Sequence, residues 1–276
     1  SNLILTAAHC NSAYRLVRIG SIWAEESSLG GTRKGVDAKV IKRMRHPSYT
    51  GENGNLYDFV ILELDRNIDT NLYPPVELNF NMNVPGNQDM TTAIGFGQLE
   101  YKGLRPDRLQ KVNIPTTSYS KCRAQYGAKI QRKEHLCAGY PEGGKDSCIG
   151  DSGGPLLSNN NNNGKLIQVG VVSFGRGCAL PNFSGVYARV SGATTWIQNT
   201  VCRKGNFNND KGVPSYCENI VTTPQPSTLN PTPQPTQAPQ QTSKPTSRST
   251  STPTSSPSTL NPTPQPTQTP QQTSKP

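Results

Sequence analysis

The chain has 276 residues and a formal net charge of +10, and roughly its first 220 residues hold nearly all of the large apolar side chains that could form a core. The basic residues of that part are dispersed and form no stripe with interleaved aromatic residues, which argues against a nucleic-acid partner. No apolar run in this sequence is long enough to cross a membrane as a helix, and no segment of it has the pattern of a secretory leader.

Short segments rich in Val, Ile and Leu recur along the first part of the chain, separated by clusters of Gly, Pro, Asn and Ser. This spacing predicts an all-β fold of short antiparallel strands. In residues 39–45, charged and apolar positions alternate, which predicts a half-exposed strand with a solvated basic face. The segments expected to be strands are residues 16–19, 38–44, 59–64, 91–96, 109–114, 155–157, 166–174 and 185–190.

Two segments have a helical pattern instead. Residues 118–126 begin with Ser118, whose hydroxyl suits the N-cap position of a helix. Residues 193–201 place Trp196, Ile197 and Val201 on one helical face. We therefore expect two helices, the second of them at the end of the folded part.

From Thr222 onward the chain is dominated by Pro, Thr, Ser and Gln, and residues 227–245 recur nearly unchanged as residues 258–276. These repeats lack the hydrophobic face that stacked solenoid repeats must bury, so they predict an extended, partly polyproline-II stalk without fixed structure. The expected organisation is a folded domain over residues 1–203, a short extension over residues 204–221 and a disordered stalk over residues 222–276.

The chain has seven cysteines, none of them in a CxxC pair or in a Cys/His cluster with the spacing of a zinc site. This pattern indicates disulfides and an oxidising compartment, and so predicts a secreted, extracellular protein. We expect no metal and no cofactor.

Three motifs carry residues suited to amide hydrolysis. Ser152 lies on the glycine-rich turn of Asp-Ser-Cys-Ile-Gly-Asp-Ser-Gly-Gly-Pro (146–155), His9 lies in Leu-Thr-Ala-Ala-His-Cys (5–10), and Asp58 lies in Tyr-Asp-Phe-Val-Ile-Leu (57–62). A serine hydroxyl becomes a competent nucleophile when it is paired with a base whose orientation is fixed by a buried carboxylate. His9, Asp58 and Ser152 can fill these three roles, in the chain order His, Asp, Ser.

With these motifs the chain resembles the trypsin-like, chymotrypsin-fold serine peptidases over residues 1–203. The separations between the three residues, 49 and 94 positions, are close to the roughly 45 and 93 of the family template. The resemblance implies two six-stranded antiparallel β-barrels followed by a C-terminal helix. It also implies an incomplete first barrel and an N-terminally truncated chain, because the sequence opens inside a strand and no activation sequence of the Ile-Val-Gly-Gly type is present.

The turn around Ser152 has two further expected roles. Missing side chains let the backbone N–H groups of Gly150 and Ser152 converge on one point, as an oxyanion hole requires. The resemblance implies that Asp151 pairs with the new N-terminal ammonium that zymogen cleavage produces. This pairing would order the oxyanion hole and the specificity pocket.

The resemblance places Asp146 at the bottom of the primary specificity pocket, with Gly175 and Gly185 at positions that keep the pocket walls open. A buried, unpaired carboxylate is costly and favours a cationic partner. We therefore expect cleavage after Arg or Lys.

The resemblance also implies disulfides, and it leaves Cys10 without a partner in this chain, because the family's partner cysteine lies about 16 residues earlier. The last pair consists of the two cysteines left over, and it would close a short loop after the last helix. The expected pairs are Cys122–Cys137, Cys148–Cys178 and Cys202–Cys217.

Two positions depart from the family pattern. Phe174 stands where a tryptophan usually follows the Val-Ser pair that lines the substrate backbone, so it keeps an aromatic wall of smaller area. Ser21 stands where calcium-binding members offer a carboxylate, so no calcium site is expected, although Glu25 and Glu26 could still supply oxygen ligands.

The leading interpretation is a secreted serine endopeptidase whose partners are polypeptide substrates with Arg or Lys at the cleaved position, and protein inhibitors. The alternative is a catalytically weak homologue that acts as a secreted inhibitor or adaptor, for example of a glucanase. The complete set of three catalytic residues favours the first. A compatible third hypothesis makes the Thr/Pro-rich tail a spacer that associates with a cell wall or matrix.

Overall fold

The computed structural model describes residues 2–10, 15–24, 35–51, 54–159, 164–202 and 217. The chain separates into two units, residues 1–225 and 226–276, and every described residue belongs to the first. The stalk expected over residues 222–276 and nearly all of the extension expected over residues 204–221 lie outside the described residues. Among the described helices, none is long and apolar enough to span a bilayer.

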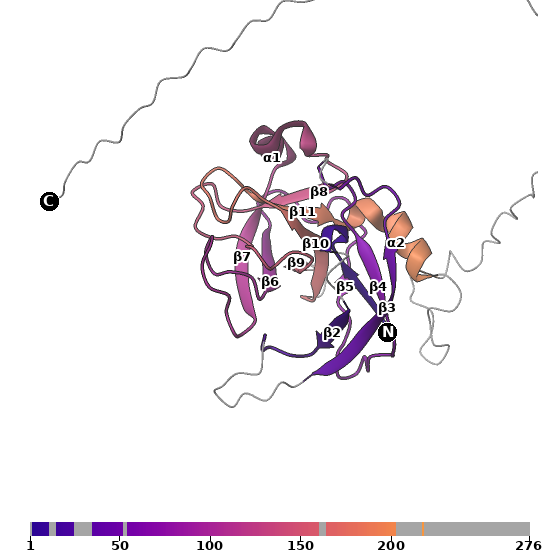
Figure 1. Ribbon diagram of the computed structural model, residues 1–276. Helices are drawn as coiled ribbons and strands as arrows, with labels where there is room; N and C mark the ends of the chain where they lie inside the picture. Colours follow the sequence, from indigo (N-terminus) through magenta and orange to yellow (C-terminus); the bar gives the residue numbers. More distant parts are fainter. Residues whose placement is uncertain are drawn as a thin grey trace, which may run out of the picture. The chain divides into compact units, whose positions relative to one another are not determined.

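The N-terminal half is a four-stranded antiparallel sheet in the order β1-β4-β3-β2 (Figure 1). Strand β4 is central, because it pairs with β1 on one edge and with β3 on the other. The strands are β1 (Leu3–Thr6), β2 (Leu16–Ile19), β3 (Val36–Arg45) and β4 (Val60–Leu64). The described part of this half is an open sheet, which confirms the prediction of an incomplete first barrel.

The second half is a closed six-stranded antiparallel barrel in the order β11-β8-β7-β6-β9-β10, closed by pairing of β10 with β11. A short strand, β5 (Glu77–Leu78), adds to β10 in parallel. The barrel strands are β6 (Met90–Gly95), β7 (Gln110–Thr117), β8 (His135–Ala138), β9 (Pro155–Asn159), β10 (Leu166–Phe174) and β11 (Gly185–Arg189). The all-β fold is confirmed, and each of the eight predicted segments overlaps a strand, with differences of up to three residues at the ends.

The basic strand β3 shows where simple alternation fails. Its register against β4 shifts between Val40 and Lys42. An extra residue in one strand reverses which side chains face the sheet. Ile41 is therefore 61% exposed beside the exposed Lys42 and Arg43. The predicted half-exposed basic strand is present, but its alternation is broken at this bulge.

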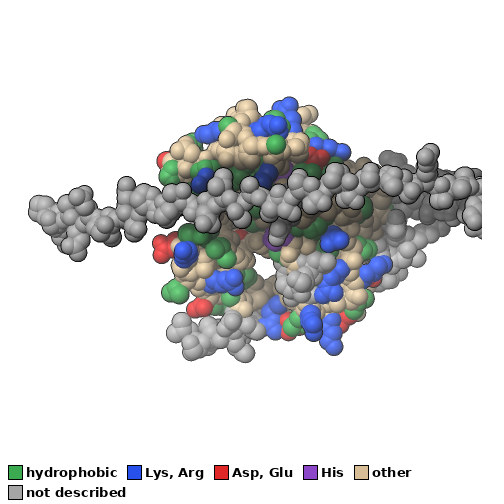
Figure 2. Space-filling model, turned by 45° about the horizontal axis from the view of Figure 1, so that its top comes forward, with side chains coloured by type: hydrophobic (Ala, Val, Ile, Leu, Met, Phe, Trp, Pro, Cys, Tyr) green, Lys and Arg blue, Asp and Glu red, His purple; other side chains and the backbone are tan. Residues whose placement is uncertain are grey.

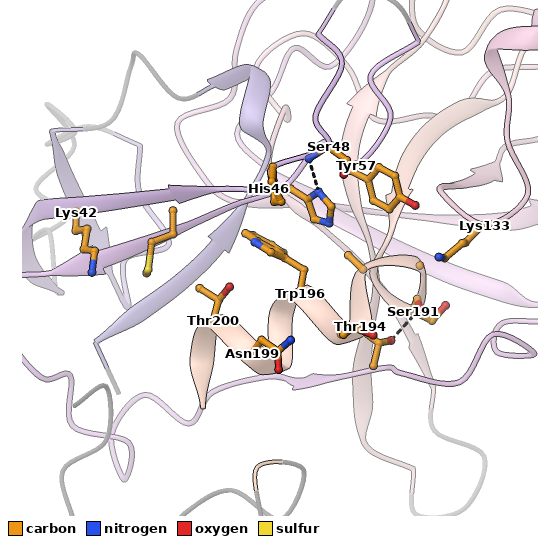
Figure 3. Close-up of a pocket in the computed structure, with 15 residues that line it drawn as sticks. Lys42, His46, Ser48, Tyr57, Lys133, Ser191, Thr194, Trp196, Asn199 and Thr200 are labelled. Carbon is orange, nitrogen blue, oxygen red and sulfur yellow. Dashed lines mark hydrogen bonds between the residues drawn. The ribbon is translucent and has the colours of Figure 1, made fainter. Parts of the chain in front are cut away.

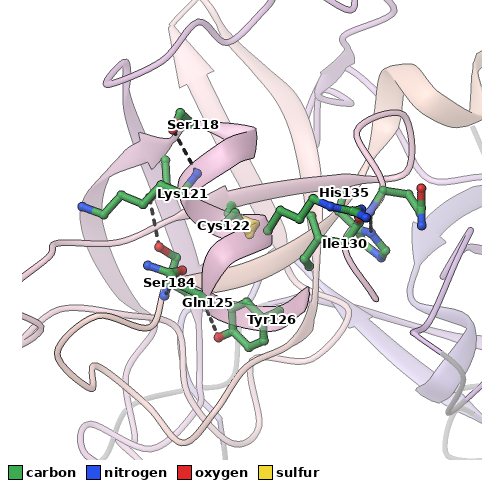
Figure 4. The surroundings of a disulfide bond; sticks show 12 residues. Ser118, Lys121, Cys122, Gln125, Tyr126, Ile130, His135 and Ser184 are labelled. Carbon is green, nitrogen blue, oxygen red and sulfur yellow. Dashed lines mark hydrogen bonds between the residues drawn. A yellow bond between two sulfur atoms is a disulfide. The ribbon is translucent and has the colours of Figure 1, made fainter. Parts of the chain in front are cut away.

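Both predicted helices are present, as α1 (Tyr119–Tyr126) and α2 (Thr194–Val201), together with three 3-10 turns, η1 (Ala8–Cys10), η2 (Gly127–Lys129) and η3 (Val190–Ala193). The Ser118 hydroxyl accepts the N–H of Lys121 at 3.3 Å, so Ser118 is the N-cap of α1 (Figure 4). Helix α2 buries Ile197 in a cluster that also contains Phe59 and Val171, one residue from each half of the fold.

All three predicted disulfides are present. One of them joins α1 to β8 (Figure 4), and Cys10 is a free cysteine among the described residues. The bonds are Cys122–Cys137, Cys148–Cys178 and Cys202–Cys217.

Charged side chains are spread over the face seen in Figure 2, with Lys and Arg on its upper and lower parts and Asp and Glu among them. Within the described ranges, no three His, Cys, Asp or Glu side chains come close enough together to hold a metal ion. Glu25 and Glu26 lie outside those ranges, so the expectations of no calcium and no nucleic-acid partner stay predictions.

Candidate active site

The pairing of β1 with β4 brings His9 and Asp58 to one edge of the open sheet. Thr6, the last residue of β1, lies opposite Val60, the first residue of β4. His9 follows β1 in η1, and Asp58 precedes β4, so both extend past the same end of the strand pair. The Nδ1 atom of His9 lies 2.7 Å from Oδ2 of Asp58, and the His9 backbone N–H donates to Oδ1 at 2.9 Å.

Asp58 is fully buried and accepts a third hydrogen bond, from the Ser173 hydroxyl at 2.6 Å. Because an ionised carboxylate only accepts, Nδ1 of His9 carries the donated hydrogen, and when the ring is neutral its lone pair is therefore on Nε2. The pKa of His9 is raised above its ordinary 6.5, chiefly by the hydrogen bond with Asp58 and next by one with the Cys10 thiol, while burial opposes the rise.

The Ser152 turn is fixed to strand β10, which also supplies Ser173. The Gly153 N–H donates to the carbonyl of Val172 at 3.0 Å, and the Val172 N–H donates to the carbonyl of Gly154 at 2.9 Å. On the other side, the Thr6 hydroxyl donates to the carbonyl of Gly153 at 3.2 Å. The structure thus brings the segments of His9, Asp58 and Ser152 together, although no hydrogen bond joins the Ser152 hydroxyl to His9 among the described residues.

The two amides expected to form the oxyanion hole are free donors in the described part of the chain. On the same turn the N–H groups of Asp151, Gly153 and Gly154 are all hydrogen-bonded, whereas those of Gly150 and Ser152 have no protein acceptor there. Gly150 has φ +103°, a backbone conformation that favours glycine.

Asp151 is held by backbone amides. Its Oδ1 accepts the N–H of Gly97 and its Oδ2 accepts the N–H of Cys148, each at 2.8 Å. No cation pairs with it among the described residues. Its expected pairing with an N-terminal ammonium stays a prediction.

Asp146 lies against the two predicted glycines in different ways. Its oxygens accept the N–H groups of Ser147 at 2.8 Å and Ala179 at 3.0 Å, and burial, opposed by these bonds, raises its pKa to about 6. A Cβ on Gly185 would lie 2.6 Å from Oδ1 of Asp146, so a side chain there would cover the carboxylate. A Cβ on Gly175 would meet only a backbone oxygen at 3.4 Å, so Gly175 borders open space.

Two residues beside the site were not predicted from the sequence. Ser173 belongs to the Val-Ser pair before Phe174, but nothing local shows that it binds Asp58, 115 positions away. His135 is 3% exposed, and its ring meets the Phe174 ring edge-on, with centroids 5.7 Å apart. A single buried histidine forms no sequence pattern, and only the β8–β11 pairing places it.

A separate hollow of about 780 Å³ contains none of the predicted site residues. His46 stacks on Tyr57 with ring centroids 4.4 Å apart and lies 4.9 Å from the Trp196 ring (Figure 3). Lys42 and Lys133 also line this hollow. The hollow is therefore separate from the candidate catalytic site.

Comparison with known proteins agrees with this fold. The family described as Trypsin matches residues 1–197. Trypsin-2 of Salmo salar is 36% identical over 201 residues, which cover 72% of this chain and 81% of that protein. Trypsin of Xenopus laevis is 37% identical over 72% of this chain and 76% of its own length. The clotting factor G beta subunit of Tachypleus tridentatus is 33% identical over 71% of this chain and 66% of its own length.

The chain belongs to the trypsin family of serine proteases. The family match covers residues 1–197, a range that contains the closed barrel and two of the three disulfides, and all of these features are consistent with this assignment.

Proposed function

We propose that this protein is a secreted endopeptidase that hydrolyses peptide bonds after Arg or Lys, with Ser152 as nucleophile, His9 as base and Asp58 as the orienting carboxylate. The observation that carries the proposal is the double hydrogen bond from His9 to the fully buried Asp58. This arrangement fixes the ring orientation and the tautomer that general-base catalysis needs.

Acylation follows from these groups. The Ser152 hydroxyl oxygen attacks the substrate carbonyl carbon while its proton passes to Nε2 of His9. The carbonyl oxygen becomes an oxyanion, which the N–H groups of Gly150 and Ser152 stabilise; one such donor contributes about 2.7–4 kcal/mol. The carbon–nitrogen bond then breaks as Nε2 returns the proton to the amine, leaving an ester on Ser152.

Deacylation repeats the sequence with water. His9 takes a proton from the water as its oxygen attacks the ester carbon, and the same two amides bind the second oxyanion. When the ester bond breaks, the proton passes to the oxygen of Ser152. The products are a new carboxyl group and the free enzyme.

The specificity part of the proposal rests on Asp146. Its carboxylate is largely buried and makes hydrogen bonds only with neutral backbone amides among the described residues, so its charge is uncompensated. A guanidinium or ammonium entering beside Gly185 would supply the missing positive charge. Secretion is supported by the three disulfides, which persist in oxidising compartments.

A mixed peptide library tests the proposal. The protein is prepared in two forms. One form starts at Ser1, and the other carries an added N-terminal segment whose removal exposes an Ile-Val-Gly-Gly-type terminus. The second form is needed because Asp151 is expected to pair with the new ammonium. We expect cleavage only after Arg and Lys, and none from Ser152→Ala. Asp146→Ser should lose this preference while keeping Ser152-dependent cleavage at other bonds.

No Ser152-dependent cleavage from a folded, correctly processed sample would contradict the proposal. In that case the secreted inhibitor or adaptor would become the leading interpretation. Cleavage that persists in Ser152→Ala would instead point to a contaminating protease or to another nucleophile.

A further inference from the structure

A positively charged side chain lies against the turn that carries the candidate oxyanion hole. A Cβ built on Gly150 would lie 3.1 Å from both Nε and Nη2 of Arg105 and 3.2 Å from its Cζ. These distances are much longer than the separations of the three atoms within the planar guanidinium, so a point nearly equidistant from all three lies off its plane. The guanidinium of Arg105 therefore packs face-on against Gly150.

The loop that carries Arg105 is tied to the same turn. The Gln98 N–H donates to the carbonyl of Ile149 at 2.9 Å, which joins the loop to the residue before Gly150. The loop folds back on itself, because the Leu99 N–H donates to the carbonyl of Leu104 at 3.2 Å. Arg105 is thus placed by backbone bonds and not only by its own flexible side chain.

The charge of Arg105 is available for a ligand. The side chain is exposed, and no carboxylate lies within ion-pair distance of it in the described ranges. The carboxylate that follows Gly150 in the chain, Asp151, already accepts the N–H groups of Gly97 and Cys148. A guanidinium with one face covered still presents its N–H edge, which fits a carboxylate in a bidentate manner.

We propose that Arg105 is a specificity-determining residue that favours substrates with Asp or Glu within two residues C-terminal to the cleaved bond. This inference rests on the proposed function. The turn holds Asp146 for a cationic side chain and, four residues later, Gly150 with Arg105 against it. Phe174 and Gly175 are expected to line the part of the substrate before the cleaved bond. Gly150 is expected to bind the carbonyl of the cleaved bond itself, so Arg105, which packs against Gly150, is proposed to meet the residues that follow that bond.

Matched peptides test the proposal. Each carries Arg at the cleaved position, and the next two positions hold Glu-Glu, Gln-Gln or Lys-Lys. We expect the wild-type protein to cleave the Glu-Glu peptide with a kcat/KM about two- to fivefold higher than the Gln-Gln peptide, and 0.5 M salt to reduce this ratio. Arg105→Gln should abolish the ratio, and Arg105→Glu should invert it in favour of Lys-Lys.

The chain supplies a matched control in Arg108. This arginine is also exposed and lies close to Arg105 in sequence, but its guanidinium lies 5.0 Å from the centroid of the Trp23 ring. Arg108→Glu should keep the wild-type order of the three peptides. An unchanged order in Arg105→Glu, or an equal change in Arg108→Glu, would overturn the proposal.

A binding measurement separates this inference from the proposed function. Fluorescence anisotropy of the labelled peptides on the Ser152→Ala protein needs no catalysis, and it should rank Glu-Glu above Gln-Gln. Adding Arg105→Glu to Ser152→Ala should reverse that order. Loss of cleavage with the predicted binding order would count against the peptidase alone, whereas cleavage with no dependence on Arg105 would count against this inference alone.

Discussion

The two halves of the fold contribute different kinds of group to the candidate site. The open sheet provides two side chains, His9 and Asp58, whereas the closed barrel provides the Ser152 hydroxyl and the Asp146 carboxylate and adds backbone amides to them. The barrel holds its own groups through local turns. The sheet depends on the barrel, because Ser173 of β10 completes the hydrogen bonding of Asp58. The orientation of the base therefore depends on contact between the halves.

The largest expected loss of activity comes from a substitution in the open sheet. Asp58→Asn keeps the shape of the side chain but offers His9 an amide, which lets the wrong tautomer form. We expect kcat to fall by about 10⁴-fold, the size of effect that this change has on the same triad. Steady-state kinetics on an Arg peptide measures the loss, and circular dichroism checks that the fold is retained. A loss below tenfold would show that Asp58 does not orient the base.

The contact between the halves is tested by Ser173→Ala. Removing this donor leaves one bond fewer on a buried charge, and hydrogen bonds to charged groups contribute about 1.5–3 kcal/mol. We expect kcat/KM to fall by about ten- to a hundredfold.

Ser191→Ala is the matched control for Ser173→Ala. Ser191 is 6% exposed against 5% for Ser173, and its hydroxyl has no hydrogen-bond partner among the described residues. The kcat/KM of Ser191→Ala should stay within twofold of the wild-type value. Equal losses in both variants would show that serine burial matters there, and not the bond to Asp58.

A smaller effect is expected when the pH is changed, because the carboxylate of Asp146 in the closed barrel titrates. With its pKa raised to about 6 by burial, Asp146 is ionised above pH 6 and becomes neutral below it. Since only the ionised form attracts a cation, KM for Arg peptides should rise as the pH falls from 7 to 5. Inhibition by benzamidine, a small cation, should weaken in parallel, and Asp146→Asn should bind it weakly at every pH. Benzamidine affinity that does not vary with pH would contradict this assignment.

The smallest expected effect is on the pH dependence of stability, and it involves one buried histidine from each half of the fold. Burial lowers the pKa of His135 in β8, opposed chiefly by Glu134, and burial with Lys133 nearby lowers the pKa of His46 after β3. At these two positions the unfolded chain takes up protons near pH 6.5 while the folded protein does not. The stability that these two histidines contribute is therefore full above pH 6.5 and declines as the pH falls below it, while the raised pKa of Asp146 acts in the opposite direction below pH 6. Denaturant titrations from pH 7.5 to 5 should show this slope. His135→Gln and His46→Gln should each reduce the slope of stability against pH. An unchanged slope in both variants would contradict the assignment of this pH dependence to the two histidines.

Much of the site could be predicted from the sequence because its parts are local motifs. His9, Asp58 and Ser152 each lie in a recognisable stretch, and the structure brings their three segments together as expected. Both helices could be placed, α1 from the local cap signal of Ser118 and α2 from the apolar face of Trp196, Ile197 and Val201. These features depend on neighbours in sequence, and such patterns can be recognised without a fold.

The features that the sequence did not reveal all depend on register between distant strands. The outward turn of Ile41 depends on a bulge against β4, and the bond from Ser173 to Asp58 depends on how β10 meets the sheet. The position of Arg105 over Gly150 depends on a loop bond to Ile149. None of these pairings leaves a periodic trace in the chain, and each becomes visible only when both partners are placed.

The hydrogen bond from Thr6 to Gly153 joins residues 147 positions apart, and that from Ser173 to Asp58 joins residues 115 apart. Contacts of such long range are slow to form, because a large loop must close before they can be made. The turns that shape the oxyanion donors and the Asp146 carboxylate are short-range by comparison. A newly made chain could therefore build its substrate-recognition surfaces before it aligns its base, a sequence of events that delays proteolytic competence until the two halves have met.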